Sequence, residues 1–516
     1  MAFINLTQYL DRTAQTDATS FAVHDGGVSL SFGDLRRICL GIGWQMAKVL
    51  GEAKNQIIAV YLPKSTGAVQ ANIASLYSGN AYMNLSIKDP SMRTRAILDK
   101  IRPALVVTNR RLEKQIAAIS QDFPVLVLED VLDAPGLSPA DESHVLALRD
   151  RIIDTDPSCV INTSGSTGTP KGVVLNHSSF VDFIERVTAA RLVKKHEVMA
   201  GLSPLVFDIY SFELCMVMAN ACTLVLVPET FSAFPVRILE LMNRHAVSFI
   251  FWVPTIMVSI ANMELLDSVP LPSLKTVWFA GEVFPTAKCN YWRSRLPGAL
   301  FVNMYGPIEI TLDCLYYVMN RPLLDSEPIP IGSRFANTDI MLLTEEDTLA
   351  ASGQDGEICV RGTSLALGYY NDPEKTAAAF VQNPLNTAYP ERIYRTGDIA
   401  AVNPHGEFIF RGRKDTLVKH SGYRIDLAEI EHVVVNNLRL ALNCCALYHQ
   451  QEKQIYLLYE LPEPLDGNVF RKQLGTVVPR YMVPGVYVHV PKFPCNTNGK
   501  IDRLLLAQQY CSPKSE

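Results

Sequence analysis

Apolar and polar residues follow two regular patterns along most of the chain. Short and almost continuous apolar runs, such as residues 57–62 and 276–280, predict buried strands. Longer amphipathic stretches lie between such runs, as in residues 35–50 and 235–244, and their apolar positions recur at helical spacing. Strands that alternate with helices of this length predict βαβ units in a largely parallel sheet.

The same patterns extend over the first three hundred residues or so and predict two doubly wound halves. In such folds, ligands gather at the carboxyl edge of the sheet. The further predicted strands are residues 28–32, 104–108, 125–128, 158–161, 173–175, 223–227, 248–253 and 300–304. The further predicted helices are residues 3–14, 65–77 and 91–101.

The pattern of predicted elements changes near residue 331. Short strands separated by turns follow, at residues 340–343, 356–361 and 408–411, and they predict a small β-rich subdomain over about 331–412. A compact α+β pattern begins after this region. We therefore expect an α/β protein with a large N-terminal domain, residues 1–412, and a small C-terminal α+β domain, residues 413–516.

Composition narrows the class of protein. A chain of 516 residues is too long for one compact core, and its formal net charge of −5 without a basic block argues against nucleic acid as a partner. The 11 cysteines are scattered without metal-ligand spacing, which favours reduced thiols. Neither a signal peptide nor an apolar run of membrane-spanning length is evident, so we expect a cytoplasmic enzyme that is not inserted in a membrane.

A loop rich in serine, threonine and glycine, residues 162–172, separates two predicted strands. Its glycines let backbone N–H groups converge, its hydroxyls add donors and Lys171 adds a positive charge, a combination suited to phosphate oxygens. The loop is not a Walker A motif, because Pro170 precedes Lys171 and Gly172 follows it. Taken alone, such a loop is also compatible with a simple flexible turn.

Several stretches occur together in a fixed order, and on them the chain resembles the adenylate-forming superfamily. That superfamily includes amino-acid adenylation domains of peptide synthetases, acyl-CoA ligases and luciferases. The likeness is greatest to stand-alone ligases that load glycine, as in lipid A modification, or D-alanine onto a carrier protein. The matching stretches are residues 76–82, 163–172, 207–208, 280–282, 303–309, 356–370, 394–398, 412–429 and 496–503.

The resemblance implies a reaction in two halves that uses ATP and Mg²⁺. A carboxylate attacks the α-phosphorus of ATP, which gives an acyl adenylate and pyrophosphate; a thiol then displaces AMP to form a thioester. The sequence contains no condensation motif and no appended carrier domain. The implied partner is therefore a separate carrier protein with a phosphopantetheine thiol or, as a weaker alternative, coenzyme A.

The resemblance also assigns the phosphate end of the nucleotide. Glu309 would help to bind Mg²⁺, Lys500 would bridge the substrate carboxylate and the α-phosphate, and Arg424 would meet the phosphate in the adenylating pose. Positive charge is needed there because one anion attacks another. The loop residues that would hold the β- and γ-phosphates are Thr163, Ser164, Gly165, Ser166, Thr167, Gly168 and Lys171.

The nucleoside end and the mobile part follow in the same way. Asp398 would accept both ribose hydroxyls with Arg413 beside it, while Tyr305 would stack on adenine and Asn303 would contact the base edge. The small C-terminal domain would rotate between the half-reactions. The two residues implied for that motion and for the thiol tunnel are Asp415, at the hinge, and Gly422.

Each assignment has an ordinary structural alternative. Lys500 could be a solvated lysine, Asp398 a turn residue and Asp208 a helix cap. Glu309 could be a charged residue after a turn, and the acid and base around the hinge could form a surface ion pair. The joint order of the motifs favours the functional interpretation.

Asp208 points to the class of acid. It stands where amino-acid-activating relatives keep a carboxylate for the substrate ammonium, and a buried ammonium needs such a counter-charge. The side-chain pocket implied by the resemblance is crowded, which favours glycine first and alanine of either hand second, unless some of the aromatic residues belong to the core. Asp313 could be a second partner for the amine or an ordinary polar contact. The pocket residues are Ile209, Phe212, Phe251, Trp278, Ala280, Met304, Leu312 and Asp313.

The chain departs from the family pattern at a few positions. Ile308 stands where a threonine is usual, so a hydroxyl near phosphate and metal is missing, and Thr311 is a candidate to replace it. Leu367 stands where many relatives have arginine. Two rival hypotheses remain: a CoA ligase for a small acid, which Asp208 disfavours, and a non-catalytic adenylate-fold scaffold, which the retained lysines and carboxylates disfavour.

Overall fold

The structure is a computed structural model that describes residues 3–133, 136–163, 170–414, 417–441, 443–494 and 501–511. It is an α/β protein whose chain divides into two compact units. The first unit comprises residues 1–87, 101–161 and 172–414, and the second comprises residues 88–100, 162–171 and 415–516. In the described part of the chain, no helix is both long and apolar enough to cross a membrane.

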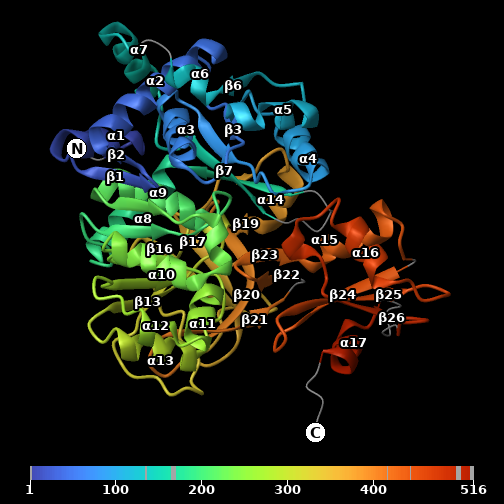
Figure 1. Ribbon diagram of the computed structural model, residues 1–516. Helices are drawn as coiled ribbons and strands as arrows, with labels where there is room; N and C mark the ends of the chain where they lie inside the picture. The colour runs from blue at the N-terminus through green and yellow to red at the C-terminus, as the bar shows by residue number, and fades with distance from the viewer. Residues whose placement is uncertain are drawn as a thin grey trace. The chain divides into compact units, whose positions relative to one another are not determined.

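A nine-stranded sheet carries the second predicted half, in the order β15-β14-β13-β12-β11-β9-β10-β1-β2. Figure 1 labels β1, β2 and β13 of this sheet. Its centre is parallel, and its edges are antiparallel at β2, β14 and β15. The strands are β1 (Phe21–Asp25), β2 (Val28–Ser31), β9 (Val198–Gly201), β10 (Thr223–Leu226), β11 (Phe249–Trp252), β12 (Thr276–Phe279), β13 (Leu300–Tyr305), β14 (Leu315–Val318) and β15 (Ser333–Arg334).

A seven-stranded sheet, in the order β18-β8-β7-β4-β3-β5-β6, carries the first half. Its centre is again parallel, and β18 pairs antiparallel with β8 at its edge, with Tyr369 opposite Val173. The strands are β3 (Ile57–Val60), β4 (Ala81–Asn84), β5 (Leu105–Thr108), β6 (Val125–Val127), β7 (Pro157–Thr163), β8 (Lys171–Asn176) and β18 (Gly368–Tyr369).

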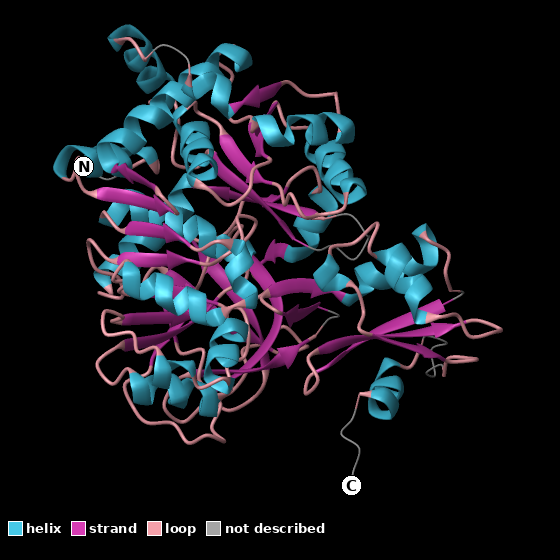
Figure 2. Ribbon diagram, viewed as in Figure 1, coloured by secondary structure: helices cyan, strands magenta, loops and turns pink. Residues whose placement is uncertain are grey.

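A third, antiparallel sheet contains the short strands predicted after residue 331, each slightly longer than expected. All described strands are magenta in Figure 2. Its order is β16-β17-β20-β19, and β21 also pairs with β20. The strands are β16 (Thr338–Leu343), β17 (Gly356–Gly362), β19 (Phe380–Gln382), β20 (Arg392–Val402) and β21 (Phe408–Arg413).

The longer helices begin and end at recognisable signals. Ser31 caps α2 by accepting the N–H of Asp34, and Gly51 ends that helix in the left-handed conformation. The helix predicted from residue 3 instead begins at Thr7, because the side chain of Gln8 accepts the N–H groups of Ile4 and its neighbour. The helices of the first unit other than α4, which crosses into the second unit, are α1 (Thr7–Thr16), α2 (Phe32–Leu50), α3 (Thr66–Tyr77), α5 (Arg110–Ile119), α6 (Leu128–Leu132), α7 (Pro139–Arg149), α8 (His177–Ala189), α9 (Asp208–Asn220), α10 (Pro235–Arg244), α11 (Pro254–Asn262), α12 (Leu265–Ser268), α13 (Thr286–Arg295) and α14 (Pro373–Ala379).

The second unit has its own small core around a three-stranded sheet, β24-β25-β26. Within this unit Arg93 of α4 (Ser91–Ile101) donates to Glu429 at 2.6 Å, and both side chains are buried. Its other elements are β22 (Leu417–His420), β23 (Tyr423–Asp426), α15 (Leu427–His432), β24 (Asn443–His449), β25 (Gln454–Glu460), α16 (Gly467–Leu474), β26 (Val486–His489) and α17 (Arg503–Tyr510).

Candidate active site

One face of the nine-stranded sheet meets α9 and forms a closed cluster of aromatic residues. Phe251 on β11 lies opposite Trp278 on β12, and both belong to the same buried cluster as Phe212 of α9. The ring of Phe212 lies 5.2 Å from that of Phe251 and 5.1 Å from that of Trp278. Their neighbours Ile250 and Val277 face the other side of the sheet and belong to a second cluster, as strand alternation requires.

Four of the remaining predicted pocket residues belong to the same cluster. Ala280 lies two positions after Trp278 on the same side of the sheet, and Met304 comes from the next strand. Ile209 and Leu312 also belong to this cluster. The indole N–H of Trp278 is buried without a hydrogen-bond partner among the described residues. The eight predicted pocket residues are all buried, and the rings of Phe212, Phe251 and Trp278 pack against one another.

Asp208 is the first residue of α9 and is partly exposed. One of its carboxylate oxygens accepts the N–H of Ile209 at 2.9 Å. The N-cap position of α9 is Phe207 and not Asp208, but the Asp208 carboxylate still accepts an N–H group in the first turn of the helix. The positive end of the helix dipole stabilises a negative charge at this position.

A strained turn leads from β13 into the predicted metal site. Thr311 and Leu312 have φ of 57° and 67°, and a Cβ on Gly306 would lie 2.2 Å from the carbonyl oxygen of Leu312. Only glycine therefore fits at position 306. The turn buries Asp313, and it buries the hydroxyl of Thr311 without a hydrogen-bond partner among the described residues.

Glu309 lies within this turn, on the short helix η2 (Ile308–Ile310), and is fully buried. The hydroxyl of Tyr369 donates to its Oε1 at 2.8 Å, and the N–H of Ala366 donates to its backbone oxygen at 2.9 Å. Carboxylate and hydroxyl oxygens are the ligands that Mg²⁺ prefers. The described residues contain no cluster of three or more metal-ligating side chains, so an Mg²⁺ held here would share its ligands with substrate phosphates.

Asp398 forms the centre of the predicted nucleoside site. The hydroxyl of Tyr305 donates to its Oδ2 at 2.5 Å, and Arg413, directly opposite it on β21, donates to its Oδ1. Arg413 also donates to the carbonyl oxygen of Thr396 at 2.9 Å. Burial, followed by the nearby charge of Asp398, raises the pKa of Tyr305 well above its usual value. The structure thus brings three of the predicted nucleotide residues together.

Asn303 lies two residues before Tyr305, on β13. Its side-chain amide donates to the carbonyl oxygen of Pro330 at 2.8 Å, which fixes the orientation of the side chain. It is largely buried, with 8% of its surface exposed. The contact is compatible with the predicted role of its amide at the base edge, because each amide offers several hydrogen-bonding positions.

The predicted residues of the second unit are only partly described. Gly422 lies in the turn between β22 and β23 with φ of 82°, a conformation that favours glycine, and Arg424 lies opposite Lys419 on that hairpin. Thr163 ends β7 with its hydroxyl buried and without a partner among the described residues, and Lys171 begins β8. Seven predicted residues lie outside the described residues: Ser164, Gly165, Ser166, Thr167, Gly168, Asp415 and Lys500.

The sequence did not single out two residues whose contacts fix neighbouring parts of the fold. Tyr369 was noted only as part of a family motif, although its contact with Glu309 is the clearest link between that motif and the metal carboxylate. Glu282 binds the start of α11, because its carboxylate accepts the N–H of Thr255 at 3.1 Å and its hydroxyl at 2.5 Å. Both residues stood in quoted motifs, but a motif does not reveal what a side chain contacts.

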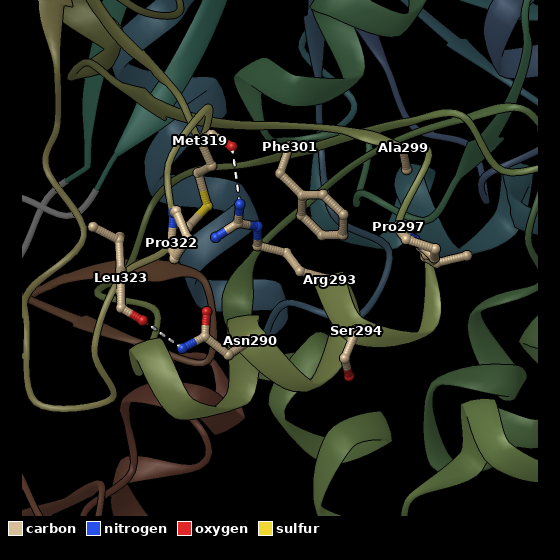
Figure 3. Close-up of a pocket in the computed structure, with 10 residues that line it drawn as sticks. Asn290, Arg293, Ser294, Pro297, Ala299, Phe301, Met319, Pro322 and Leu323 are labelled. Carbon is tan, nitrogen blue, oxygen red and sulfur yellow. Dashed lines mark hydrogen bonds between the residues drawn. The ribbon is translucent and has the colours of Figure 1, made fainter.

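A hollow of about 500 Å³ lies elsewhere in the first unit, between α13 and β13 (Figure 3). Figure 3 shows Asn290 donating to the carbonyl oxygen of Leu323, at 2.9 Å, and Arg293 donating to that of Met319, at 3.1 Å. None of the predicted site residues lines it. Its polar groups are engaged with backbone carbonyls, and we assign it no role in the chemistry.

Comparison with known proteins agrees with this geometry. Residues 7–370 match the family described as AMP-binding enzyme. The chain is 31% identical to zwittermicin A synthase ZmaJ of Bacillus cereus, over 90% of this chain and 88% of that protein. It is 28% identical to the L-proline–[L-prolyl-carrier protein] ligase of Streptomyces coelicolor, over 88% of this chain and 87% of that protein. It also matches surfactin synthase subunit 1 of Bacillus subtilis, at 28% identity, but spans only 14% of that longer protein.

Solved structures share the fold. The adenylation domain AlmE of Vibrio cholerae, in complex with glycyl-adenosine-5'-phosphate, superposes with a TM-score of 0.81 at 19% identity, over 99% of both chains. The protein PA1221, which contains adenylation and carrier domains, gives a TM-score of 0.81 at 23% identity, over 98% of this chain and 84% of that chain. At these identities the likeness establishes the fold, a large and a small domain of mixed α/β structure.

Proposed function

The chain belongs to the AMP-binding enzyme family, whose members use ATP and Mg²⁺, and on that premise we propose that it activates a small amino acid as its adenylate. Glycine is the first candidate and alanine of either hand the second. The aminoacyl group would then pass to the phosphopantetheine thiol of a separate carrier protein. The names of two similar proteins support this class of reaction: a prolyl–carrier-protein ligase and a domain bound to glycyl adenylate.

The position of Asp208 at the start of α9, the helix that also carries Phe212 of the aromatic cluster, is the observation that supports the proposal most. Its carboxylate stands at the start of α9, and Phe212, one turn along that helix, packs against Trp278. If Asp208 binds the ammonium group of an amino acid, the side chain of that amino acid would face the aromatic cluster. The closely packed rings of that cluster leave room only for a small side chain. A filled pocket excludes large side chains effectively, because they clash with its residues. Preference for alanine over glycine would be weak, because the two differ by one methyl group.

Charged side chains of this protein would assist the first half-reaction. The substrate carboxylate attacks the α-phosphorus, the bond to the bridging oxygen breaks and pyrophosphate leaves. Lys500 would stabilise the developing charge between the two anions, and Lys171 with its loop would hold the leaving phosphates. When bound at Glu309, Mg²⁺ would neutralise phosphate charge.

The nucleoside would be held by Asp398. Its two oxygens already accept hydrogen bonds from Tyr305 and Arg413, which fix the carboxylate in one orientation and leave each oxygen a further lone pair for a ribose hydroxyl. The ring of Tyr305 would be held in place for stacking on adenine. Pre-set orientation of this kind lowers the entropy cost of binding.

The second half-reaction would use the C-terminal part of the chain. We propose a domain boundary near residue 413, rotation about Asp415 and a thiol path past Gly422, with Arg424 contacting phosphate in the adenylating pose. In the transfer step the thiolate attacks the acyl carbon, and AMP leaves with the electron pair of the broken bond.

Product analysis tests the proposal. Hydroxylamine added to enzyme, MgATP and glycine should trap the activated acid as its hydroxamate and release AMP and pyrophosphate in equal amounts. Supply of a phosphopantetheinylated carrier protein should replace the need for hydroxylamine, whereas free coenzyme A should not. Efficient acylation of coenzyme A with acetate or propionate would instead favour a small-acid CoA ligase. Absence of any adenylate from a panel of acids would favour the non-catalytic scaffold.

A further inference from the structure

A short segment joins the predicted metal carboxylate to the strand that leaves the phosphate loop. This segment, residues 366–370, contacts Glu309 twice: through the N–H of Ala366 to its backbone and through the hydroxyl of Tyr369 to its side chain. The same segment pairs with β8, whose residues Gly172 and Val174 accept the N–H groups of Tyr370 and Leu367 at 2.7 and 2.9 Å. Residues 366–370 therefore brace Glu309 against β8.

Residues 366–370 are themselves held in place by Thr376. The hydroxyl of Thr376 accepts the N–H of Tyr369 at 2.9 Å. Gly368 has φ of 140°, and a Cβ there would lie 2.6 Å from the Thr376 methyl group, so the close approach of these two residues needs glycine. Tyr369 is 7% exposed and Glu309 is fully buried, so water has little access to compete for the bond between them. The direction of the Tyr369 hydroxyl is therefore set by the backbone.

From these contacts we infer that Tyr369 is a positioning residue for the metal carboxylate, an inference that rests on the proposed role of Glu309. The Tyr369 hydroxyl occupies one side of Oε1 and so restricts the rotation of the carboxylate that would meet the metal. Ile308, immediately before Glu309, has no polar atom in its side chain that could do this. Groups that hydrogen-bond to a metal ligand commonly change metal affinity by about 10- to 100-fold when removed.

The test compares two variants that each lose one buried hydroxyl. Tyr369→Phe removes the hydroxyl that contacts Glu309, and Tyr317→Phe removes a hydroxyl on β14 that has no partner among the described residues. For each protein, the melting temperature is measured with ATP alone and with ATP at rising MgCl₂. The metal-dependent increment of melting temperature needs no acid substrate.

We expect the Mg²⁺ concentration that gives half of this increment to rise about tenfold in Tyr369→Phe and to stay unchanged in Tyr317→Phe. Pyrophosphate exchange should show the same rise in Mg²⁺ requirement, while the KM for the amino acid changes by less than about twofold. A general loss of structure would instead change both the Mg²⁺ requirement and the KM for the amino acid. Thr376→Val, which removes the acceptor of the Tyr369 N–H, should raise the Mg²⁺ requirement in the same direction by a smaller factor.

The outcomes separate the inference from the proposed function. An unchanged Mg²⁺ requirement in a folded Tyr369→Phe protein overturns the inference, and so does an equal rise in Tyr317→Phe. A wild-type protein whose melting temperature does not respond to Mg²⁺ in the presence of ATP also overturns it. A wild-type protein that shows this response but exchanges no acid contradicts the proposed function, while the inference about Tyr369 is still decided by the melting data.

Discussion

The hydroxyl of Tyr305 donates a hydrogen bond to Oδ2 of Asp398 at 2.5 Å, between two buried residues that lie far apart in the sequence. One residue ends β13 of the nine-stranded sheet, and the other lies on β20 of the small antiparallel sheet. The bond thus joins a residue predicted to stack on adenine to the residue predicted to accept the ribose. We interpret it as the contact that fixes both halves of a nucleoside site.

Removal of this bond should weaken ATP binding without abolishing activity. Tyr305→Phe keeps the ring but frees the Asp398 carboxylate to rotate, and a hydrogen bond to a charged group is worth about 1.5–3 kcal/mol. We expect the KM for ATP in pyrophosphate exchange to rise about tenfold, with a smaller change in kcat. The matched control is Tyr456→Phe, which removes a tyrosine–carboxylate bond to Glu452 on the surface of the second unit and should leave KM unchanged. An unaltered KM in Tyr305→Phe would contradict the nucleoside assignment.

Replacement of the carboxylate at α9 should remove recognition of the amine. In Asp208→Asn the substrate ammonium loses its counter-charge, so we expect kcat/KM for glycine to fall at least about 100-fold. An acid without an amine, such as acetate, should lose much less, because it never used this charge. The exposed Asp355→Asn serves as control. Equal losses for glycine and acetate would show that Asp208 supports the fold rather than the amine.

Truncation of one aromatic residue should widen the range of acids. Phe251→Ala opens space beside Trp278 and should raise kcat/KM for leucine relative to glycine at least about tenfold. It should also lower the free energy of unfolding by about 3–5 kcal/mol, as such core truncations do. Phe284→Ala is the matched control, because Phe284 is equally buried but packs against Phe279 in the cluster on the other face of the sheet. A similar change of specificity in the control would refute the pocket assignment.

A buried carboxyl far from this chemistry should make stability depend on pH. Glu197 accepts a hydrogen bond from Thr276 at 3.2 Å, its second oxygen has no partner among the described residues, and burial raises the pKa of its carboxyl to about 7. Because the folded state holds the proton more tightly than the unfolded state, its contribution to stability is complete below about pH 4.5 and is lost as the pH rises to about 7.

Glu197→Gln keeps the shape and removes this penalty. We expect it to raise the free energy of unfolding at pH 8 by up to about 3 kcal/mol, and to change it much less at pH 5. Urea denaturation at the two pH values measures both. The exposed Glu345→Gln should show no such difference. A gain that is the same at pH 5 and pH 8 would mean that the carboxyl of Glu197 is not the titrating group.

Local signals predicted much of the fold. The bounds of α4 and α10 agree with the sequence patterns, and the proline at the start of α10 is a recognised helix signal. Other elements depend on distant partners. β4 (Ala81–Asn84) was missed because its apolar run is short and ends in a polar residue, and β1 takes its place in the sheet by pairing with β10, so that Val23 lies opposite Leu224. Tertiary packing decides such strands, and no short window of sequence contains it.

The residues of the candidate site were also predicted only in part. Motifs identified residue types such as Glu309 and Asp398, because the family resemblance ties them to positions. The resemblance also placed Arg413 beside Asp398, and the two residues lie opposite each other on β21 and β20. The contact between Tyr369 and Glu309 was not predicted, because only the folded chain brings these two segments together. The left-handed conformations of Thr311 and Leu312 were equally hidden, because threonine and leucine are not residues that signal such a turn.

The most direct measurement is amino-acid-dependent exchange of pyrophosphate into ATP, across the twenty amino acids and D-alanine, with Lys500→Ala as the inactive control. The account predicts strong exchange with glycine, weaker exchange with alanine, none with large side chains and loss of all exchange in the variant. Best exchange with a large amino acid would contradict the filled pocket. Undiminished exchange in Lys500→Ala, or no exchange with any amino acid, would contradict the proposed adenylation itself.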